Sequence, residues 1–451
     1  MIVLALSGIL RAVNTLHTVS LFQGEGKRTM NDHIKLEKPY SEREFVPGQL
    51  SYRQLSPGRL SCPRAAKSLR RFIKRMSVVV MVSLLLVPIL GLVLHANQQS
   101  QRPVHATQAA LNSQDALIAS HVNDLLMHAV TLQQFSGSVL LAHHDKVLLS
   151  KGYSMADWSK QVPNTAHTRF YLGSTTKQFT AMAILILQAR SKLQVHDPIC
   201  SYIAPCPRPW QQVTIHELLT HTSGIPEFDH TGVSNASPQS WIDGFDDVPL
   251  GFAPGSEFSY CNVCYQILGY VVEKVSGEPY CTFLQQTIFE PLQMKSSGCD
   301  QPYLSLPDHA VGYASWRVQD VSIGLDAAPQ WSFLCGAGLV YSTVEDLFRW
   351  DQALSSHTLI SQQVLDEAFT PYVPSQYAGS SYGYGWFIAK APSAGHRLIW
   401  HDGRVNGFRT YNGLYLDDGV TIIFLSNLST LDELALARAL EQIAFAHLTH
   451  A

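Results

Sequence analysis

Beyond residue 75 the sequence is short of positive charge. The 451-residue chain has 32 lysines and arginines, and 14 of them lie in residues 1–75 beside 5 acidic residues, so residues 76–451 hold 18 basic against 30 acidic residues. A body with this balance lacks the basic face that would neutralise the phosphates of a nucleic acid. We therefore expect no nucleic-acid partner.

Internal repeats and low-complexity tracts are also missing. Apolar residues make up 46% of the chain and charged residues 15%, which is the balance of an ordinary globular protein. The length allows one large domain or two moderate ones with substantial cores.

Long apolar runs are limited to one, at residues 76–94. Its 19 residues carry no charge, and as a helix they would span roughly 28 Å, enough to cross the hydrocarbon of a membrane. Four basic residues stand just before it, and the next basic residue after it is Arg102. The positive-inside rule then predicts a cytoplasmic arm over 1–75 and a membrane-anchored domain outside the cytoplasm. The arm shows no sustained periodicity, so we expect it to be disordered. A cleaved signal peptide ending near Ala96 and a buried core helix are the alternatives, and Met30 and Met76 are alternative start residues.

Seven of the eight cysteines follow this run. An odd number outside the cytoplasm leaves at least one cysteine unpaired. Cys200 and Cys206 bracket a short loop, and they either form a disulfide or are two unrelated small core residues. Cys261 and Cys264 have a redox spacing, but no thioredoxin-like pattern surrounds them and no further metal ligands lie nearby. We expect neither a redox motif nor a metal site there.

The pattern of apolar residues predicts an α+β domain over residues 113–451, after a linker at 95–112. An antiparallel sheet flanked by helices would be built from both ends of the domain, with the helical middle forming a lobe beside it. The expected elements are a helix at 115–130, a hairpin at 136–142 and 147–153, a helix at 174–190, two late strands within 410–427, and a final helix at 431–448.

The first candidate for chemistry is Ser174 with Lys177. Ser174 stands where a turn becomes a helix, and Lys177 projects from the same face one turn later. A serine hydroxyl is a weak nucleophile until a base accepts its proton, and a partly buried lysine near a helix N-terminus has reason to be neutral. Ser-x-x-Lys is common on solvated helices, but here an apolar helix follows, which favours a catalytic pair.

The second candidate is Tyr260 with Asn262, after the turn Pro254-Gly255. A phenol accepts or relays a proton when a nearby ammonium lowers its pKa. The asparagine amide can hold both the lysine and a substrate carbonyl.

The third candidate is the segment from His401 to Arg404, just before a predicted strand. Gly403 would let a substrate backbone lie against an edge strand, and the backbone N–H of Arg404 would pair with that of Ser174 as an oxyanion hole. The alternative for His401 is a satisfied core or surface histidine.

Taken together these stretches resemble the penicillin-recognising serine hydrolases, above all class C β-lactamases and the related D-alanyl-D-alanine carboxypeptidases, D-aminopeptidases and esterases. The likeness spans roughly residues 130–447. It includes the segment LLTHTSG at 218–224 and the run from Gly336 to Asp346. The resemblance implies a β-lactamase/transpeptidase-like fold. By the same resemblance the nucleophile is Ser174, its base Lys177, the proton relay Tyr260, and the substrate contacts Asn262, His401 and Gly403.

One departure from that pattern concerns substrate charge. β-Lactamases of this group usually carry Lys-Thr-Gly where this chain has His401-Asp402-Gly403. A lysine is a permanent anchor for a substrate carboxylate, whereas histidine is only partly charged near neutrality, and Asp402 adds a negative charge. We expect poor turnover of anionic β-lactams. Arg404 or Arg409 is the hypothetical replacement anchor.

Metal chemistry is not indicated, although the chain has 19 histidines. His216 and His221 lie five residues apart, about 140° round a helix, so they cannot share a face as zincin ligands do. We expect no metal and no cofactor.

The expected activity is acyl transfer to Ser174 followed by hydrolysis. Substrates would be D-amino-acid peptides, small esters or amides, and, less efficiently, β-lactams. A hypothesis from another class is a tethered module that senses peptidoglycan or β-lactams by acylating without turnover. The sequence does not fix the oligomeric state.

Overall fold

The computed structural model describes residues 113–227, 237–299, 305–319, 332–390 and 395–448, all within one compact unit. Its centre is an eight-stranded antiparallel sheet in the order β2-β1-β14-β13-β12-β11-β10-β9. These strands are β1 (Gly137–His143), β2 (Lys146–Tyr153), β9 (Val373–Pro374), β10 (Ser380–Tyr382), β11 (Phe387–Lys390), β12 (Arg397–Val405), β13 (Phe408–Tyr415) and β14 (Val420–Ser426). The remaining strands form two-stranded pairs: β3 (Met155–Asp157) with β4 (Val162–Pro163), β5 (Phe170–Tyr171) with β8 (Tyr341–Ser342), and β6 (Tyr313–Ser315) with β7 (Val318–Gln319).

The two ends of the domain meet inside this sheet. The early strand β1 pairs with the late strand β14 along its whole length, from Gly137 opposite Ser426 to His143 opposite Val420. Successive side chains of both strands point alternately into two apolar cores, one on each face of the sheet. Because successive side chains of a strand point to opposite faces, a fully buried strand feeds a core on each side. The prediction of one antiparallel sheet built from both ends is confirmed.

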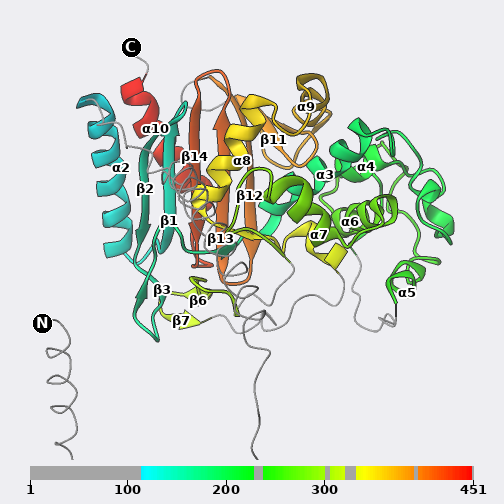
Figure 1. The fold of residues 1–451 in the computed structure, drawn as a ribbon, viewed down its shortest axis with the longest axis horizontal. Coiled ribbons are helices and arrows are strands. Elements are labelled where there is room, and N and C mark those ends of the chain that lie inside the picture. Colours follow the sequence, from blue (N-terminus) through cyan, green and yellow to red (C-terminus); the bar gives the residue numbers. More distant parts are fainter. Residues whose placement is uncertain (1–112, 228–236, 300–304, 320–331, 391–394, 449–451) are drawn as a thin grey trace, which may run out of the picture. The chain divides into compact units, whose positions relative to one another are not determined.

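Helices cover both faces of the sheet. On one face α2 (Ser113–Thr131) and α10 (Glu433–Leu448) lie side by side, and their apolar residues share a core with Val139 and Leu141 of β1. On the other face α3 (Lys177–Ala189) and α8 (Val344–Ser356) share a core with Leu140 and Ala142. Figure 1 shows α2 and α10 at one end of the molecule and α8 across the sheet.

The predicted helical lobe lies beside the sheet (Figure 1). It contains α4 (Ile215–Leu219), α5 (Pro238–Asp243), α6 (Asn262–Ser276) and α7 (Tyr280–Leu284), while α9 (Gln362–Ala368) contacts α3. Short 3₁₀ turns cover Gly173–Thr176, Ile199–Ser201, Arg208–Trp210 and Ser332–Ala337, and a π-turn covers Gln285–Phe289.

Disulfides staple the lobe. Three bridges join Cys200 to Cys206, Cys261 to Cys264, and Cys281 to Cys299. For the first pair the sequence allowed either a disulfide or two unrelated core residues, and the structure has the disulfide. Cys335 keeps its thiol, which is buried and donates to the carbonyl of Cys299 at 3.6 Å.

Element boundaries match the predictions closely, with one informative exception. The helix expected at 174–190 begins as a separate 3₁₀ turn, Gly173–Thr176, and becomes α-helical only at Lys177. Ser174 therefore sits in a tight turn before α3, and this turn lies against β12.

The predicted membrane segment, 76–94, lies outside the described residues, as do the arm at 1–75 and the linker at 95–112. Within the part of the chain that the structure describes, no helix has the length and apolarity to cross a membrane.

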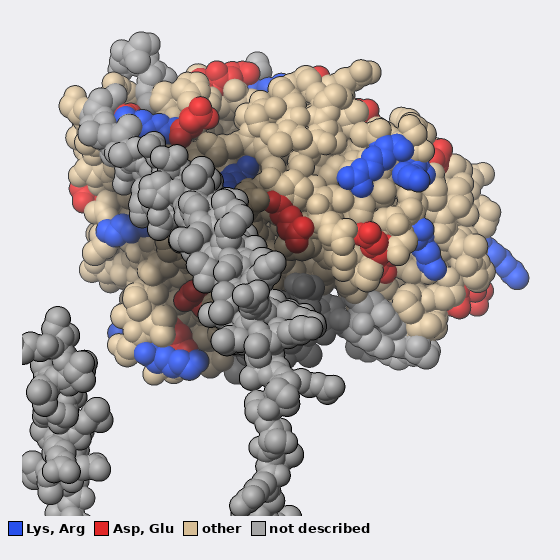
Figure 2. Space-filling model, viewed as in Figure 1, with Lys and Arg blue, Asp and Glu red and all other residues tan. Residues whose placement is uncertain are grey.

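The face shown in Figure 2 carries lysines and arginines dispersed among acidic and uncharged residues.

Candidate active site

Two glycines bring the Ser174 turn against the sheet. Gly173 has a φ of +54°, and a Cβ there would lie 2.7 Å from the backbone nitrogen of Arg404. A Cβ at Gly403 would lie 1.9 Å from the carbonyl oxygen of Leu172. Thr410 of the next strand also donates to that carbonyl at 2.6 Å. Only glycine permits this close approach of the two backbones, so Gly403 lets the turn that carries Ser174 pack against β12.

Lys177 is fully buried, and its amine lies next to the Ser174 hydroxyl. Its Nζ lies 3.1 Å from Ser174 Oγ, 2.8 Å from Asn262 Oδ1 and 2.8 Å from the carbonyl oxygen of Ala337. Burial lowers the pKa of Lys177 to about 7. The neutral amine has two N–H groups, which the amide oxygen and the carbonyl oxygen accept. Its lone pair then faces the serine hydroxyl, which is the arrangement that a general base requires.

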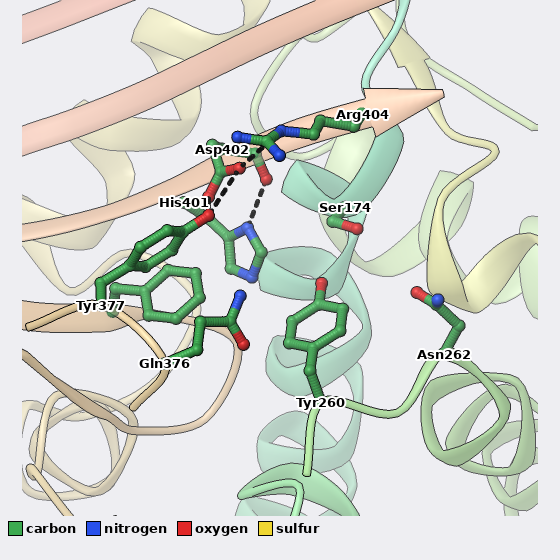
Figure 3. A pocket seen from close by; sticks show the side chains of 9 residues that line it. Ser174, Tyr260, Asn262, Gln376, Tyr377, His401, Asp402 and Arg404 are labelled. Carbon is green, nitrogen blue, oxygen red and sulfur yellow. Dashed lines mark hydrogen bonds and ion pairs between the residues drawn. The ribbon is translucent and has the colours of Figure 1, made fainter. Parts of the chain in front are cut away.

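Tyr260 lies two residues before the start of α6 at Asn262. Its hydroxyl points toward Ser174 (Figure 3), and Lys177 Nζ lies 4.8 Å from the centre of its ring. Burial raises the pKa of Tyr260 well above its ordinary value, and the nearby Ser174 hydroxyl opposes this rise. We expected a neighbouring ammonium to lower this pKa. The structure instead holds Tyr260 as a neutral phenol, which can donate or relay a proton.

His401 is uncharged, contrary to the expectation of partial charge. Burial lowers its pKa to about 3. Its Nδ1–H donates to the carbonyl oxygen of Asp402 at 2.6 Å, and its Nε2 accepts from the Tyr382 hydroxyl at 3.0 Å. Both ring nitrogens are thereby satisfied, and the imidazole supplies no positive charge to a substrate.

These side chains surround one cavity of about 230 Å³. Its lining is Ser174, Tyr260, Asn262, Gln376, Tyr377, Phe387, His401, Asp402 and Arg404 (Figure 3). Five of the seven predicted site residues therefore line it, while Lys177 lies behind Ser174 and Gly403 supports the turn. Gln376, Tyr377 and Phe387 were not predicted, because they come from a segment of short strands without a chemical motif.

Strand β12 forms an edge only where the cavity lies. β11 pairs with it from Arg397 to Trp400, whereas β13 pairs with it as far as Val405. Beyond Trp400 the side of β12 away from β13 has no strand partner among the described residues. The expected edge at Gly403 is therefore local: β12 continues past the last residue that pairs with β11.

The two arginines proposed as anchors have protein partners. Arg404 Nε donates to Glu433 and lies 3.6 Å from an Asp402 oxygen. Arg409 donates to the carbonyl oxygens of Phe408 at 2.8 Å and Val405 at 3.4 Å. Of the two, only Arg404 lines the cavity.

The histidines weighed as zinc ligands serve different partners. His216 Nδ1 lies 2.8 Å from the Tyr384 hydroxyl, and His221 Nδ1 accepts the backbone N–H of Cys261 at 3.1 Å. The sulfurs of Cys281, Cys299 and Cys335 lie within 4.8 Å of one another. Two of these sulfurs form a disulfide, so they are not thiolate ligands.

A serine beside a buried amine of lowered pKa, with a phenol pointing toward it and a cavity at a local strand edge, defines a serine hydrolase of the acyl-transfer type. The chain belongs to the beta-lactamase family, whose model matches residues 122–445. The resemblance to the penicillin-binding and β-lactamase group of serine hydrolases is therefore confirmed, as is the β-lactamase/transpeptidase-like fold.

Individual relatives agree with the family match. The chain is 31% identical to penicillin-binding protein 4* of Bacillus subtilis, over 72% of this chain and 76% of that protein. It is 29% identical to the putative penicillin-binding protein PbpX of the same organism, over 74% and 85%. An octameric penicillin-binding protein homologue from Pyrococcus abyssi superposes with a TM-score of 0.63 at 26% identity, over 72% of this chain and 77% of that one. A penicillin-binding protein from Bacillus halodurans gives 0.61 at 27%, over 70% and 98%.

Proposed function

We propose that this protein hydrolyses small D-amino-acid peptides, esters or amides through an acyl-enzyme on Ser174. The observation that carries the proposal is the set of three contacts at Lys177 Nζ, two to pure acceptors and one to the serine hydroxyl. With a pKa of about 7, a large share of Lys177 is the free base near neutrality, so the serine proton has a destination at hydrogen-bonding distance.

The reaction proceeds in two balanced halves. Ser174 Oγ bonds to the substrate carbonyl carbon while its proton passes to Lys177 Nζ. The bond to the leaving group then breaks, and the leaving nitrogen or oxygen receives that proton through the Tyr260 hydroxyl. Water next bonds to the acyl carbon, the Oγ–carbon bond breaks, and a proton from water returns to Ser174 Oγ. Backbone N–H groups of Ser174 and Arg404 are the proposed oxyanion donors.

The size of the cavity favours small acyl groups. Its volume of about 230 Å³ lies below the roughly 300–1,000 Å³ typical of pockets for drug-sized ligands. An acyl group of one or two residues suits this space better than a long peptide.

Intact-mass spectrometry tests the proposal. Wild type is exposed separately to a fluorophosphonate, a D-Ala-D-Ala peptide and penicillin, and p-nitrophenyl acetate turnover is measured alongside. We expect one adduct per chain with the fluorophosphonate and sustained ester hydrolysis, both lost in Ser174→Ala. Ser356→Ala, which makes the same change at an exposed hydroxyl at the end of α8, keeps both.

The same experiment separates the sensor hypothesis from the hydrolase. A sensor gives a burst of one leaving group per chain and a lasting adduct, with no further turnover. An adduct that persists in Ser174→Ala would contradict the assignment of the nucleophile.

We also propose that residues 76–94 anchor the chain in a membrane with the hydrolase domain outside the cytoplasm. This rests on the sequence alone, on the 19-residue apolar run and its one-sided basic flank. Alkaline carbonate extraction of membranes from expressing cells tests it. The full chain is expected in the pellet and a chain starting at residue 95 in the supernatant; a full chain in the supernatant contradicts the anchor.

A further inference from the structure

The cavity lining holds one carboxylate, Asp402, and one guanidinium, Arg404. Asp402 lines it and is only 6% exposed. The hydroxyl of Tyr377 lies 3.2 Å from each of its carboxylate oxygens, which fixes the carboxylate in place. Figure 3 shows Asp402, Tyr377 and Arg404 converging on the wall opposite Asn262.

Arg404 cannot offset this charge for a substrate, because it is already shared. Its Nε donates to Glu433, a carboxylate at the start of α10 that is 2% exposed, and it lies 3.6 Å from Asp402. Two carboxylates therefore face one guanidinium. The local balance remains negative by one charge when both are ionised.

The other nitrogen bases at the site supply no spare cation. His401 is neutral, with both ring nitrogens occupied. Lys177 is buried behind Ser174 and directs its nitrogen to three protein atoms. A further carboxylate, Glu227, accepts the backbone N–H of Asn262 on the opposite side of the site. Within the described lining, a substrate carboxylate would meet Asp402 without an uncommitted cation.

We propose that this cavity selects acyl donors that carry an ammonium group and rejects those that carry a carboxylate, with Asp402 as the residue that determines this specificity. The inference rests on the proposed hydrolase function and names the substrate class of the same site. An ammonium placed beside Asp402 gains a charge-assisted hydrogen bond to a carboxylate that Tyr377 holds in place. A carboxylate there meets like-charge repulsion and loses its hydration.

A set of three substrates that differ in one substituent tests the inference. They are the p-nitroanilides of D-alanine, isobutyric acid and methylmalonic acid, which place an ammonium, a methyl group or a carboxylate on the same carbon beside the same scissile amide. For wild type we expect kcat/KM to fall in that order, by about tenfold at each step, the size of effect that a charge-assisted hydrogen bond gives. A carboxylate substrate that equals or exceeds the methyl substrate overturns the proposal.

The variant Asp402→Asn keeps the shape of the side chain and removes its charge. We expect the ratio of kcat/KM between the ammonium and methyl substrates to shrink about tenfold in this variant. Asp247→Asn makes the same change at an exposed carboxylate of the helical lobe, and its ratio should match wild type. An unchanged ratio in Asp402→Asn overturns the assignment of this residue. The wild-type order requires no variant, so a failure of Asp402→Asn to fold still leaves the substrate class tested.

Binding to the Ser174→Ala protein separates this inference from the proposed hydrolysis. Calorimetric titration with D-alaninamide, isobutyramide and methylmalonamate measures the charge preference without any reaction. The expected affinity order is ammonium, methyl, carboxylate. If wild type neither releases p-nitroaniline nor reacts with a fluorophosphonate, the hydrolase proposal fails, while the titrations still decide the charge preference. Equal affinities, or tightest binding of the carboxylate, refute that preference.

Discussion

The imidazole of His221 lies against the ring of Tyr260, with ring centroids 4.4 Å apart and planes inclined by 36°. His221 is fully buried and has a φ of +59°. Its Nδ1 accepts the backbone N–H of Cys261, the residue that follows Tyr260. His221 therefore packs against the Tyr260 ring and holds the adjacent backbone through its hydrogen bond to Cys261. The segment LLTHTSG contributes to the site by holding this phenol, without contacting the cavity itself.

The disulfide between Cys261 and Cys264 restrains the same segment. Cys261 separates Tyr260 from Asn262, and its sulfur accepts the backbone N–H of Cys264 at the start of α6. We predict that the double change Cys261→Ala with Cys264→Ala lowers kcat/KM about tenfold, because a displacement of about 1 Å can cost up to 100-fold in rate. Steady-state kinetics on a p-nitrophenyl ester measures it.

The bridge between Cys200 and Cys206 provides the matched control. It spans 6 residues, against 3 for the bridge at the site, so loop-closure entropy predicts that removing either costs about 2 kcal/mol of stability. Cys200→Ala with Cys206→Ala should therefore lower the melting temperature by a similar amount yet keep kcat/KM near wild type. Equal kinetic losses in both double variants would show that the first bridge has only a general structural role.

The pH dependence of acylation should report on Lys177. Its pKa is lowered to about 7 by burial, and only the neutral amine accepts the serine proton. The acylation rate is thus predicted to rise with pH, to reach half its maximum near pH 7 and to level off above it. Stopped-flow measurement of ester acylation between pH 5 and 9 checks this, within the range where the fold persists by circular dichroism.

Two variants assign that midpoint. Lys177→Arg keeps a positive charge that does not titrate in this range, so it should lose the midpoint and about 10²–10⁴-fold of the rate. Tyr260→Phe should slow acylation yet keep the midpoint near 7, since the raised pKa of Tyr260 keeps it a phenol throughout. A midpoint that disappears in Tyr260→Phe would instead identify the phenol as the base.

The sheet could be predicted from both ends of the sequence because its inner strands are strongly apolar and bounded by turns. The strands at 137–143 and 420–426 each contain a run of four apolar residues, VLLA and IIFL. By contrast, β9, β10 and β11 have 2, 3 and 4 residues, too few to show a period. The sequence predicted a turn at Ser174, but not that it is a separate 3₁₀ turn lying against β12.

The residues of the site could be predicted, but their charge states could not. Ser174, Lys177 and Tyr260 follow from the order of the motifs. The pKa of Tyr260 is raised by the burial of its own hydroxyl, which only the folded chain shows. The pairing of Arg404 with Glu433 joins segments 29 residues apart in sequence, and no local pattern marks it.

Gly403 offers a test of how the Ser174 turn is held. A Cβ at this position would lie 1.9 Å from Leu172 O and 2.1 Å from Thr410 Oγ1. Gly403→Ala is predicted to cost roughly 1–3 kcal/mol of stability through overpacking and to lower kcat/KM more than 10-fold by displacing the turn. Urea unfolding and ester kinetics measure the two effects. Gly251→Ala, where the nearest atom would be 3.7 Å away, should leave both near wild type, and a harmless Gly403→Ala would contradict the contact.

Removing both carboxylates from Arg404 should reverse the charge preference of the cavity. In Asp402→Asn with Glu433→Gln the guanidinium loses its two ionic partners while remaining on the cavity wall. A freed arginine can bind a substrate carboxylate through two parallel hydrogen bonds. We therefore predict that the methylmalonic p-nitroanilide becomes a better substrate than the isobutyric one by about tenfold in kcat/KM, the opposite of the wild-type order. Adding Arg404→Gln to the double variant should return the two substrates to parity. If the double variant still disfavours the carboxylate, the rejection comes from the shape of the cavity rather than from Asp402 and Glu433.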